Sequence, residues 1–415
     1  MAAAVQISSV PRDHEHNALP VYKQVPETKY ELEWADLVTL DLSKFDQPGG
    51  KEALAKQLFD AIQTIGFFYI VNFGLNQEEV DRQFAIGKSV FELSTEEKLK
   101  YRADLENGGY NGYKPLGLRV SIRIIIMAKV PIILLMLNLV IQEIRPGIFD
   151  NTEIFNIPKF IPAYERPQPE VIDKNRADIE DFARRIHNDI VKKLLVLFAI
   201  ILELPENHFA ARHRYDEALS DCHLRYMKYH ARDVKTNERL ENVWVKGHTD
   251  FGSLTLLFRQ PVAALQVRGK DGNWKCYVNI SLFMFLVDTI LIPNRVKPYD
   301  GSITVNVADA LEFLSNGFLK SSIHRVVAPP PDQAGIDRLG VLYFVRPEDS
   351  LELRPVQSKV LERLGYNSNE NAAVAGITAG EWVKARVRAG VNRNQARSEV
   401  SEQEIVKGVK AKYYD

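Results

Sequence analysis

The chain has 415 residues, 46% of them hydrophobic, which is enough to bury a large core. Its 53 basic and 54 acidic residues are nearly equal in number, which argues against a nucleic-acid partner, since binding a polyanion depends on excess positive charge. With only two cysteines, Cys222 and Cys276, the sequence excludes a disulfide framework and a cysteine metal cluster and indicates free thiols in a reducing compartment.

The N-terminal part begins with an arm and continues with alternating strand and helix patterns. Residues 1–33 are polar and interrupted by prolines, and they lack the basic leader and apolar core of a secretory signal, so we expect a cytoplasmic protein. Residues 37–42 favour a short strand, and residues 50–65 carry apolar side chains at helical spacing. Residues 67–74 favour a buried strand that ends in a turn.

A long helical pattern covers residues 173–203, with one apolar stripe that predicts a packing helix. His187 lies off this stripe, and we expect it to be solvated rather than functional. From residue 222 the pattern changes to short β-rich runs separated by turns, with one short helix at residues 308–314. These runs lie at residues 255–258, 265–267, 303–307 and 341–345. The tail returns to helical character, with candidate helices at residues 379–386 and 401–409.

Short β runs of this kind are typical of a double-sheet jelly roll. The expected fold class is therefore mixed α/β, with a double-stranded β-helix (jelly-roll) core, flanking helices and a helical N-terminal region. The expected division of the chain is an arm at residues 1–33, an N-terminal region at 34–160, a packing-helix region at 161–220, the jelly-roll domain at 221–350 and a helical tail at 351–415.

The strongest functional pattern is a histidine and an aspartate two positions apart, His248 and Asp250, in a β-favouring stretch. Side chains two residues apart on a strand point to the same face, so this pair forms half a metal site. A second imidazole from another strand, His324, would complete the two-histidine, one-carboxylate set that suits non-haem Fe(II). The tripeptide alone is weak, because either residue could instead be solvated or hydrogen-bonded in the core.

An arginine, Arg338, opens the apolar run that follows His324. A guanidinium there can hold a carboxylate with two parallel hydrogen bonds. The alternative is an ordinary surface cation at the start of a strand.

Together these residues resemble the Fe(II)- and 2-oxoglutarate-dependent dioxygenases of the isopenicillin N synthase-like family, across residues 37–118 and 224–351. The resemblance implies that His248, Asp250 and His324 are iron ligands and that Arg338 binds the distal carboxylate of 2-oxoglutarate. Tyr229 stands where the family often has a tyrosine that reaches the same carboxylate, although a core tyrosine would explain it equally well.

The activity that the resemblance implies is oxidative. Fe(II), the co-substrate 2-oxoglutarate and O₂, with ascorbate as an activator, would hydroxylate, desaturate or cyclise a small organic molecule in specialised metabolism. The expected enzyme is monomeric and cytoplasmic and binds no membrane. Two alternatives stay open: an isopenicillin N synthase-type oxidase that needs no 2-oxoglutarate, and a non-catalytic product of a gene model with retained introns.

One position departs from the family motif. The serine that usually stands two residues after the arginine is Gly340 here. A lost hydroxyl donor is worth about 0.5–1.5 kcal/mol, so we expect weaker binding of 2-oxoglutarate rather than none.

Two apolar runs, at residues 120–142 and 278–295, do not fit the pattern. Removing the second shortens the spacing between Asp250 and His324 from 74 to 56 positions, which is usual in the family. Both runs begin with valine, whose codons start with GT, and the first ends with Gln142, which CAG encodes. We hypothesise that both are translated introns. A membrane anchor at residues 120–142 and a family-specific insertion are the alternatives.

A chain without the two runs should therefore be more soluble than the full chain, because long apolar segments promote association when they are exposed. Soluble yield and gel filtration of the two forms measure this, and transcript sequencing tests the intron hypothesis directly. Equal solubility and activity of the two forms, or a message that carries both runs, would contradict it.

Overall fold

The computed structural model describes residues 19–117, 143–145, 147–269, 274, 295–366, 376–392, 400–406 and 409–414. Both apolar runs lie outside these residues, apart from Arg295 at the end of the second. Arg295 is part of the fold, because its backbone N–H donates to Glu33 O at 3.0 Å and its carbonyl accepts from Ala35 N at 2.8 Å. Cys276 also lies outside the described residues, whereas Cys222 is a buried free thiol.

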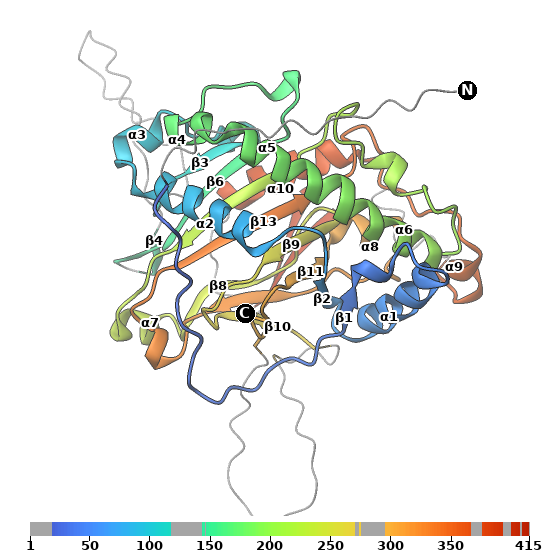
Figure 1. The fold of residues 1–415 in the computed structure, drawn as a ribbon, viewed down its shortest axis with the longest axis horizontal. Coiled ribbons are helices and arrows are strands. Elements are labelled where there is room, and N and C mark those ends of the chain that lie inside the picture. The colour runs from blue at the N-terminus through green and yellow to red at the C-terminus, as the bar shows by residue number, and fades with distance from the viewer. Residues whose placement is uncertain are drawn as a thin grey trace, which may run out of the picture.

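Two β-sheets form the centre of the molecule (Figure 1). The larger sheet has eight strands, in the order β1 (Thr39–Asp41), β2 (Phe67–Val71), β11 (Ile303–Val307), β9 (Leu254–Phe258), β13 (Arg338–Val345), β7 (His223–Tyr229), β6 (Thr152–Pro158) and β3 (Gly112–Lys114). The smaller sheet has the order β10 (Leu265–Val267), β12 (His324–Val327), β8 (Val243–His248), β15 (Val409–Tyr414) and β14 (Val400–Val406). A separate pair joins β4 (Glu143–Arg145) and β5 (Ile148–Phe149). This arrangement confirms the mixed α/β class with a jelly-roll core.

The middle strands of the larger sheet are apolar because both of their faces are covered. Leu254 and Leu256 of β9 and Ile303 and Val305 of β11 are fully buried. The sequence runs predicted these strands closely, since an apolar run of four or five residues bounded by turns has few other ways to bury its side chains.

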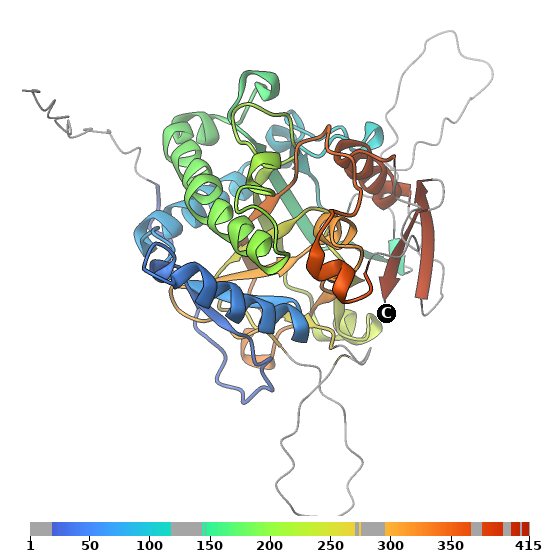
Figure 2. The same cartoon turned by 90° about the vertical axis from the view of Figure 1, so that its right-hand side faces the viewer.

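Long helices cover one side of the sheets. They are α1 (Gly50–Thr64), α2 (Gln77–Glu92), α5 (Arg176–Arg185) and α6 (Lys192–Ile201). Figure 2 shows them in blue and green, with the dark red β14–β15 hairpin and α10 (Ala379–Asn392) on the opposite side. Shorter helices are α3 (Thr95–Leu99), α4 (Glu170–Lys174), α7 (Val234–Arg239), α8 (Asp309–Leu314) and α9 (Lys359–Arg363). None of the described helices is long and apolar enough to span a bilayer.

The expected solvation of His187 is wrong. The residue lies in a π-helical turn, Ile186–Val191, between α5 and α6, and it is fully buried. A π turn holds one more residue than an α turn, so it rotates the side chains that follow, and a stripe drawn with the α-helical period misplaces them. His187 Nδ1 lies 3.0 Å from Tyr343 Oη, and its Nε2 contacts His213 O. Burial lowers the pKa of His187 to about 3.

The helix expected at residues 401–409 is also wrong, so the tail is not helical throughout. Helix α10 contains the expected segment 379–386, but β14 and β15 form a hairpin after it. The hairpin joins the smaller sheet where Tyr414 pairs with Gly247 of β8. An unpaired sheet edge gives these residues backbone partners, and such tertiary pairing overrides local helical preference.

Candidate metal centre and co-substrate site

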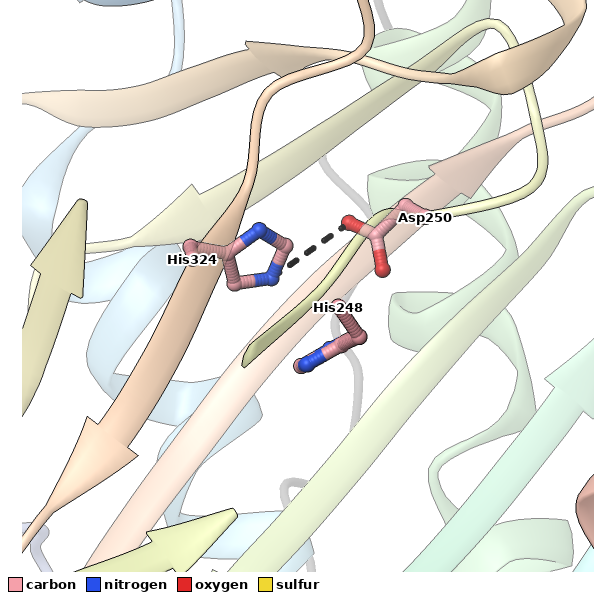
Figure 3. A group of neighbouring side chains, drawn as sticks. All are labelled: His248, Asp250 and His324. Atoms are coloured by element: carbon pink, nitrogen blue, oxygen red, sulfur yellow. Dashed lines mark ion pairs between the residues drawn. The ribbon is translucent and has the colours of Figure 1, made fainter. Parts of the chain in front are cut away.

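The predicted metal ligands lie where the chain passes between the two sheets. Strand β8 of the smaller sheet ends at His248, and Asp250 lies in the loop that leads to β9 of the larger sheet. Strand β12 begins at His324, which is the direct register partner of His248. Figure 3 shows the three side chains converging from these elements.

The geometry is that of a three-ligand metal site. One ligand atom from each of His248, Asp250 and His324 lies within 4.8 Å of the others. His324 Nε2 is 3.9 Å from Asp250 Oδ2, and the two imidazole ring centres are 4.4 Å apart. The described residues hold no fourth histidine, cysteine or carboxylate in this group.

Backbone carbonyls orient both imidazoles. His248 Nδ1 lies 2.9 Å from Lys246 O, and His324 Nδ1 lies 3.1 Å from Ser322 O. A carbonyl can only accept, so each Nδ1 carries the proton and each Nε2 keeps its lone pair for a metal. Burial, reinforced by the nearby His324, lowers the pKa of His248 to about 4, which keeps that imidazole neutral.

Two side chains hold the Asp250 carboxylate. Oδ2 accepts from Thr255 Oγ1 at 2.7 Å and from Asn306 Nδ2 at 3.1 Å. The loop is also fixed by α8, because Asp309 N donates to Asp250 O at 2.9 Å. Burial alone would raise the pKa of Asp250, but His324, His248 and the two donors outweigh it and hold the pKa well below its ordinary value. Asp250 is therefore ionised at neutral pH.

Arg338 and Tyr229 face each other on neighbouring strands. They are register partners in β13 and β7, each is 5% exposed, and the guanidinium carbon is 5.2 Å from the tyrosine ring centre. Arg338 Nε has no hydrogen-bond partner among the described residues. Burial raises the pKa of Tyr229 to about 12, although the positive charge of Arg338 beside it acts in the opposite direction. Arg338 is thus a buried cation rather than a surface one, and Tyr229 both packs on Trp244 and borders Arg338.

Known proteins match the chain in sequence and in structure. The N-terminal model of the non-haem dioxygenases, named for morphine synthesis, matches residues 37–121, and the 2OG-Fe(II) oxygenase superfamily model matches residues 291–347. A 2-oxoglutarate-dependent dioxygenase, frbH, of Dothideomycetidae sp. is 28% identical over 354 residues, which is 81% of this chain and 89% of that protein. A 1-aminocyclopropane-1-carboxylate oxidase of Dictyostelium mucoroides is 23% identical, over 76% of this chain and 83% of its own. The crystal structure of a full-length Neurospora crassa protein in complex with alpha-KG has a TM-score of 0.66 at 20% identity and covers 88% of this chain and 99% of its own.

The two family models and these relatives support a 2OG-Fe(II) oxygenase of the isopenicillin N synthase-like superfamily. It is an oxidoreductase of the 2-oxoglutarate-dependent dioxygenase class, whose cofactors are Fe(II), 2-oxoglutarate and O₂.

In the oxygenase, the polar side chain of Gln260 occupies the space beside Gly340. A β-carbon at Gly340 would lie 2.0 Å from Gln260 Nε2. Gln260 is 8% exposed, and its Oε1 has no partner among the described residues. Gly340 is two residues from Arg338 and so faces the same side of β13. An amide donor therefore stands where the family motif has a serine hydroxyl.

Sequence reasoning missed Thr255, Asn306 and Gln260 in the oxygenase. Thr255 and Asn306 are polar residues inside apolar strands, and a polar residue that breaks such a run needs a buried partner. A polar residue inside an apolar run is visible in the sequence, so this pattern could have identified Thr255 and Asn306 as candidates. Gln260 lies in the loop after β9, and the sequence does not show its contact with β13.

Replacing Thr255 by valine should weaken metal binding by the oxygenase about tenfold to a hundredfold, because the isosteric change removes a donor that orients Asp250. Titration with Fe(II) under anaerobic conditions measures the affinity. Thr304→Val is a matched control in the neighbouring strand β11, since its hydroxyl does not bond Asp250. Equal metal affinity of Thr255→Val and the unaltered protein would contradict this role.

Proposed function

We propose that His248, Asp250 and His324 bind the catalytic Fe(II) and that Arg338, with Tyr229, binds the distal carboxylate of 2-oxoglutarate. The enzyme oxidises a C–H bond of a small organic molecule in specialised metabolism. One observation carries the proposal: the ligand atoms of three residues converge within 4.8 Å while both Nδ1 atoms are already engaged.

The residues fit an Fe(II) ion. Two imidazoles and one ionised carboxylate form a ligand set that leaves other positions free for a co-substrate and O₂. Bound Fe(II) would supply the coupling of O₂ reduction and 2-oxoglutarate decarboxylation, which yields succinate and CO₂, to oxidation of the substrate.

The surrounding residues position the reactants. Arg338 is buried and has an unpaired donor, so it can form charge-assisted bonds to a carboxylate without competition from water. Helix α10 covers the loop that carries Asp250, because Arg386 Nη2 donates to Thr249 O at 3.0 Å. Trp382 of α10 is 1% exposed and packs edge-on against Phe313 of α8, at 5.1 Å between ring centres. The C-terminal helix thereby limits access of water to the metal centre.

The 2-oxoglutarate-dependent activity is favoured over an oxidase that needs only O₂. Relatives named as 2-oxoglutarate-dependent dioxygenases span most of the chain, and frbH covers 81% of it.

We further propose that the enzyme acts as a cytoplasmic monomer; the buried free thiol of Cys222 supports a reducing compartment. Gel filtration tests the oligomeric state.

The purified protein should form succinate when it is incubated with Fe(II), ascorbate and 2-oxoglutarate, even without its substrate, through slow uncoupled turnover. His248→Ala should abolish succinate formation, because it removes one of three ligands. Iron binding without succinate formation in the unaltered protein would move the assignment to the oxidase or to a non-catalytic protein.

Arg338→Met should weaken 2-oxoglutarate binding about tenfold to a hundredfold, because charge-assisted hydrogen bonds are worth about 1.5–3 kcal/mol. The affinity is measured by titrating 2-oxoglutarate into the Fe(II) protein without O₂. Arg338→Lys keeps the charge but not the paired donors and should give an intermediate affinity. If Arg338→Met bound 2-oxoglutarate normally, Arg338 would have no part in the site.

Gly340→Ser, which restores the family motif, should not tighten 2-oxoglutarate binding, because the added side chain collides with the Gln260 amide. The double variant Gly340→Ser with Gln260→Ala removes the collision and should bind better than Gly340→Ser alone. The same titration compares both variants with Gln260→Ala. Tighter binding by the single Gly340→Ser variant would show that Gln260 does not occupy this space.

A further inference from the structure

Arg346 has a buried guanidinium group for which the described residues provide no hydrogen-bond partner. It follows β13, is 1% exposed, and its Nε, Nη1 and Nη2 have no partner among the described residues. The nearest carboxylate atom, Asp221 Oδ2, is 3.9 Å from Nε, which is too far for a hydrogen bond. A buried cation whose donors are all unused destabilises the fold unless something binds it. The donors of Arg346 are therefore free for a ligand.

A second guanidinium, that of Arg225, lies with that of Arg346 beside the aromatic ring of Phe344. Arg225 belongs to β7 and is 6% exposed. Its guanidinium carbon is 4.2 Å from the ring centre of Phe344, and that of Arg346 is 5.4 Å from the same centre. Arg225 Nε donates to Asn156 Oδ1 at 2.8 Å, which fixes the side chain. Two positive groups thus meet at one ring.

This pair lies on the strand face that also carries the co-substrate arginine. Side chains alternate along a strand, so Arg338, Gly340 and Phe344 share one face of β13, and Arg346 follows just past its end. A β-carbon at Gly252 would lie 2.4 Å from Arg346 Nη1, which places Arg346 against the Asp250 loop. The second cationic site therefore lies at the opposite end of β13 from Arg338.

Aromatic rings border the second cationic site. The guanidinium carbon of Arg225 is 4.7 Å from the ring centre of Tyr110, and that of Arg346 is 4.3 Å from the ring centre of Phe251. Tyr110 and Phe251 are 6.2 Å apart between ring centres. Phe251 immediately follows the ligand Asp250. A molecule held here presents its apolar part to aromatic surfaces beside the metal.

We propose that Arg346 and Arg225 bind the carboxylate of the substrate, which is therefore a small organic acid with an apolar body. This inference rests on the proposed function, because it assigns the substrate class of the same centre. A planar carboxylate matches the paired donors of a guanidinium. Asp221 is the carboxylate nearest to Arg346, and it leaves one positive charge of the arginine pair uncompensated. Burial raises the pKa of Asp221 to about 6, so it is a weak counter-ion.

The test compares acids with their neutral amides on the protein loaded with Fe(II) and saturating 2-oxoglutarate, without O₂. The probes are benzoate, 3-phenylpropanoate and octanoate, each paired with its primary amide, and binding is measured by calorimetry. Saturating 2-oxoglutarate occupies Arg338, so added acid must bind elsewhere. At least one acid should bind at least tenfold more tightly than its amide.

Variants of Arg346 and Arg225 test whether these two side chains cause the tighter binding of acids than of amides. Arg346→Met and Arg225→Met should each reduce acid binding at least tenfold, whereas Arg354→Met, an exposed arginine outside the site, should not. Asp221→Asn should tighten acid binding, because it removes the competing carboxylate; this variant keeps the inference testable if Arg346→Met does not fold. Equal binding of acids and amides, acid binding that survives both arginine substitutions, or no binding of any acid would overturn the proposal. Failure of 2-oxoglutarate itself to bind would instead refute the proposed function.

Discussion

The pairing of β8 with β12 is the constraint on which the site depends. Their register places His248 opposite His324, at the end of one strand and the start of the other, where the chain passes between the two sheets. A shift of one residue would turn one imidazole to the other face of the smaller sheet and leave Asp250 with a single partner. The backbone pairing of these two strands therefore brings the two proposed histidine ligands together.

The polar groups that orient the three proposed ligands come from both sheets. Thr255 and Asn306 reach Asp250 from the larger sheet, while backbone carbonyls orient both imidazoles from within the smaller sheet. Strand β13 then carries a buried arginine at one end and leads to another just past its other end, Arg338 and Arg346. Both guanidinium groups have donors without a partner among the described residues, and a buried cation with unused donors is costly, which supports the two proposed anion sites.

Much of this could be predicted from the sequence, because the signals are local. The apolar runs of β9, β10 and β11 are visible directly in the sequence. The close spacing of His248 and Asp250 also identified the pair, although Asp250 lies in the loop after β8 and not on the strand. His187 and the β14–β15 hairpin could not, since a π turn changes the helical period and the hairpin depends on a free edge of β8. Gln260 and Arg346 also escaped, because their importance comes from neighbours on other segments. For Arg346 a signal did exist: it is a charged residue directly after the hydrophobic run at residues 341–345.

The most direct test of the metal centre is a crystal structure of the Fe(II) protein with an anomalous difference map recorded at the iron absorption edge. A single strong peak should lie between Nε2 of His248, Nε2 of His324 and the Asp250 carboxylate. A peak bound by other residues, or none at full iron occupancy in solution, would contradict the assignment of the three ligands.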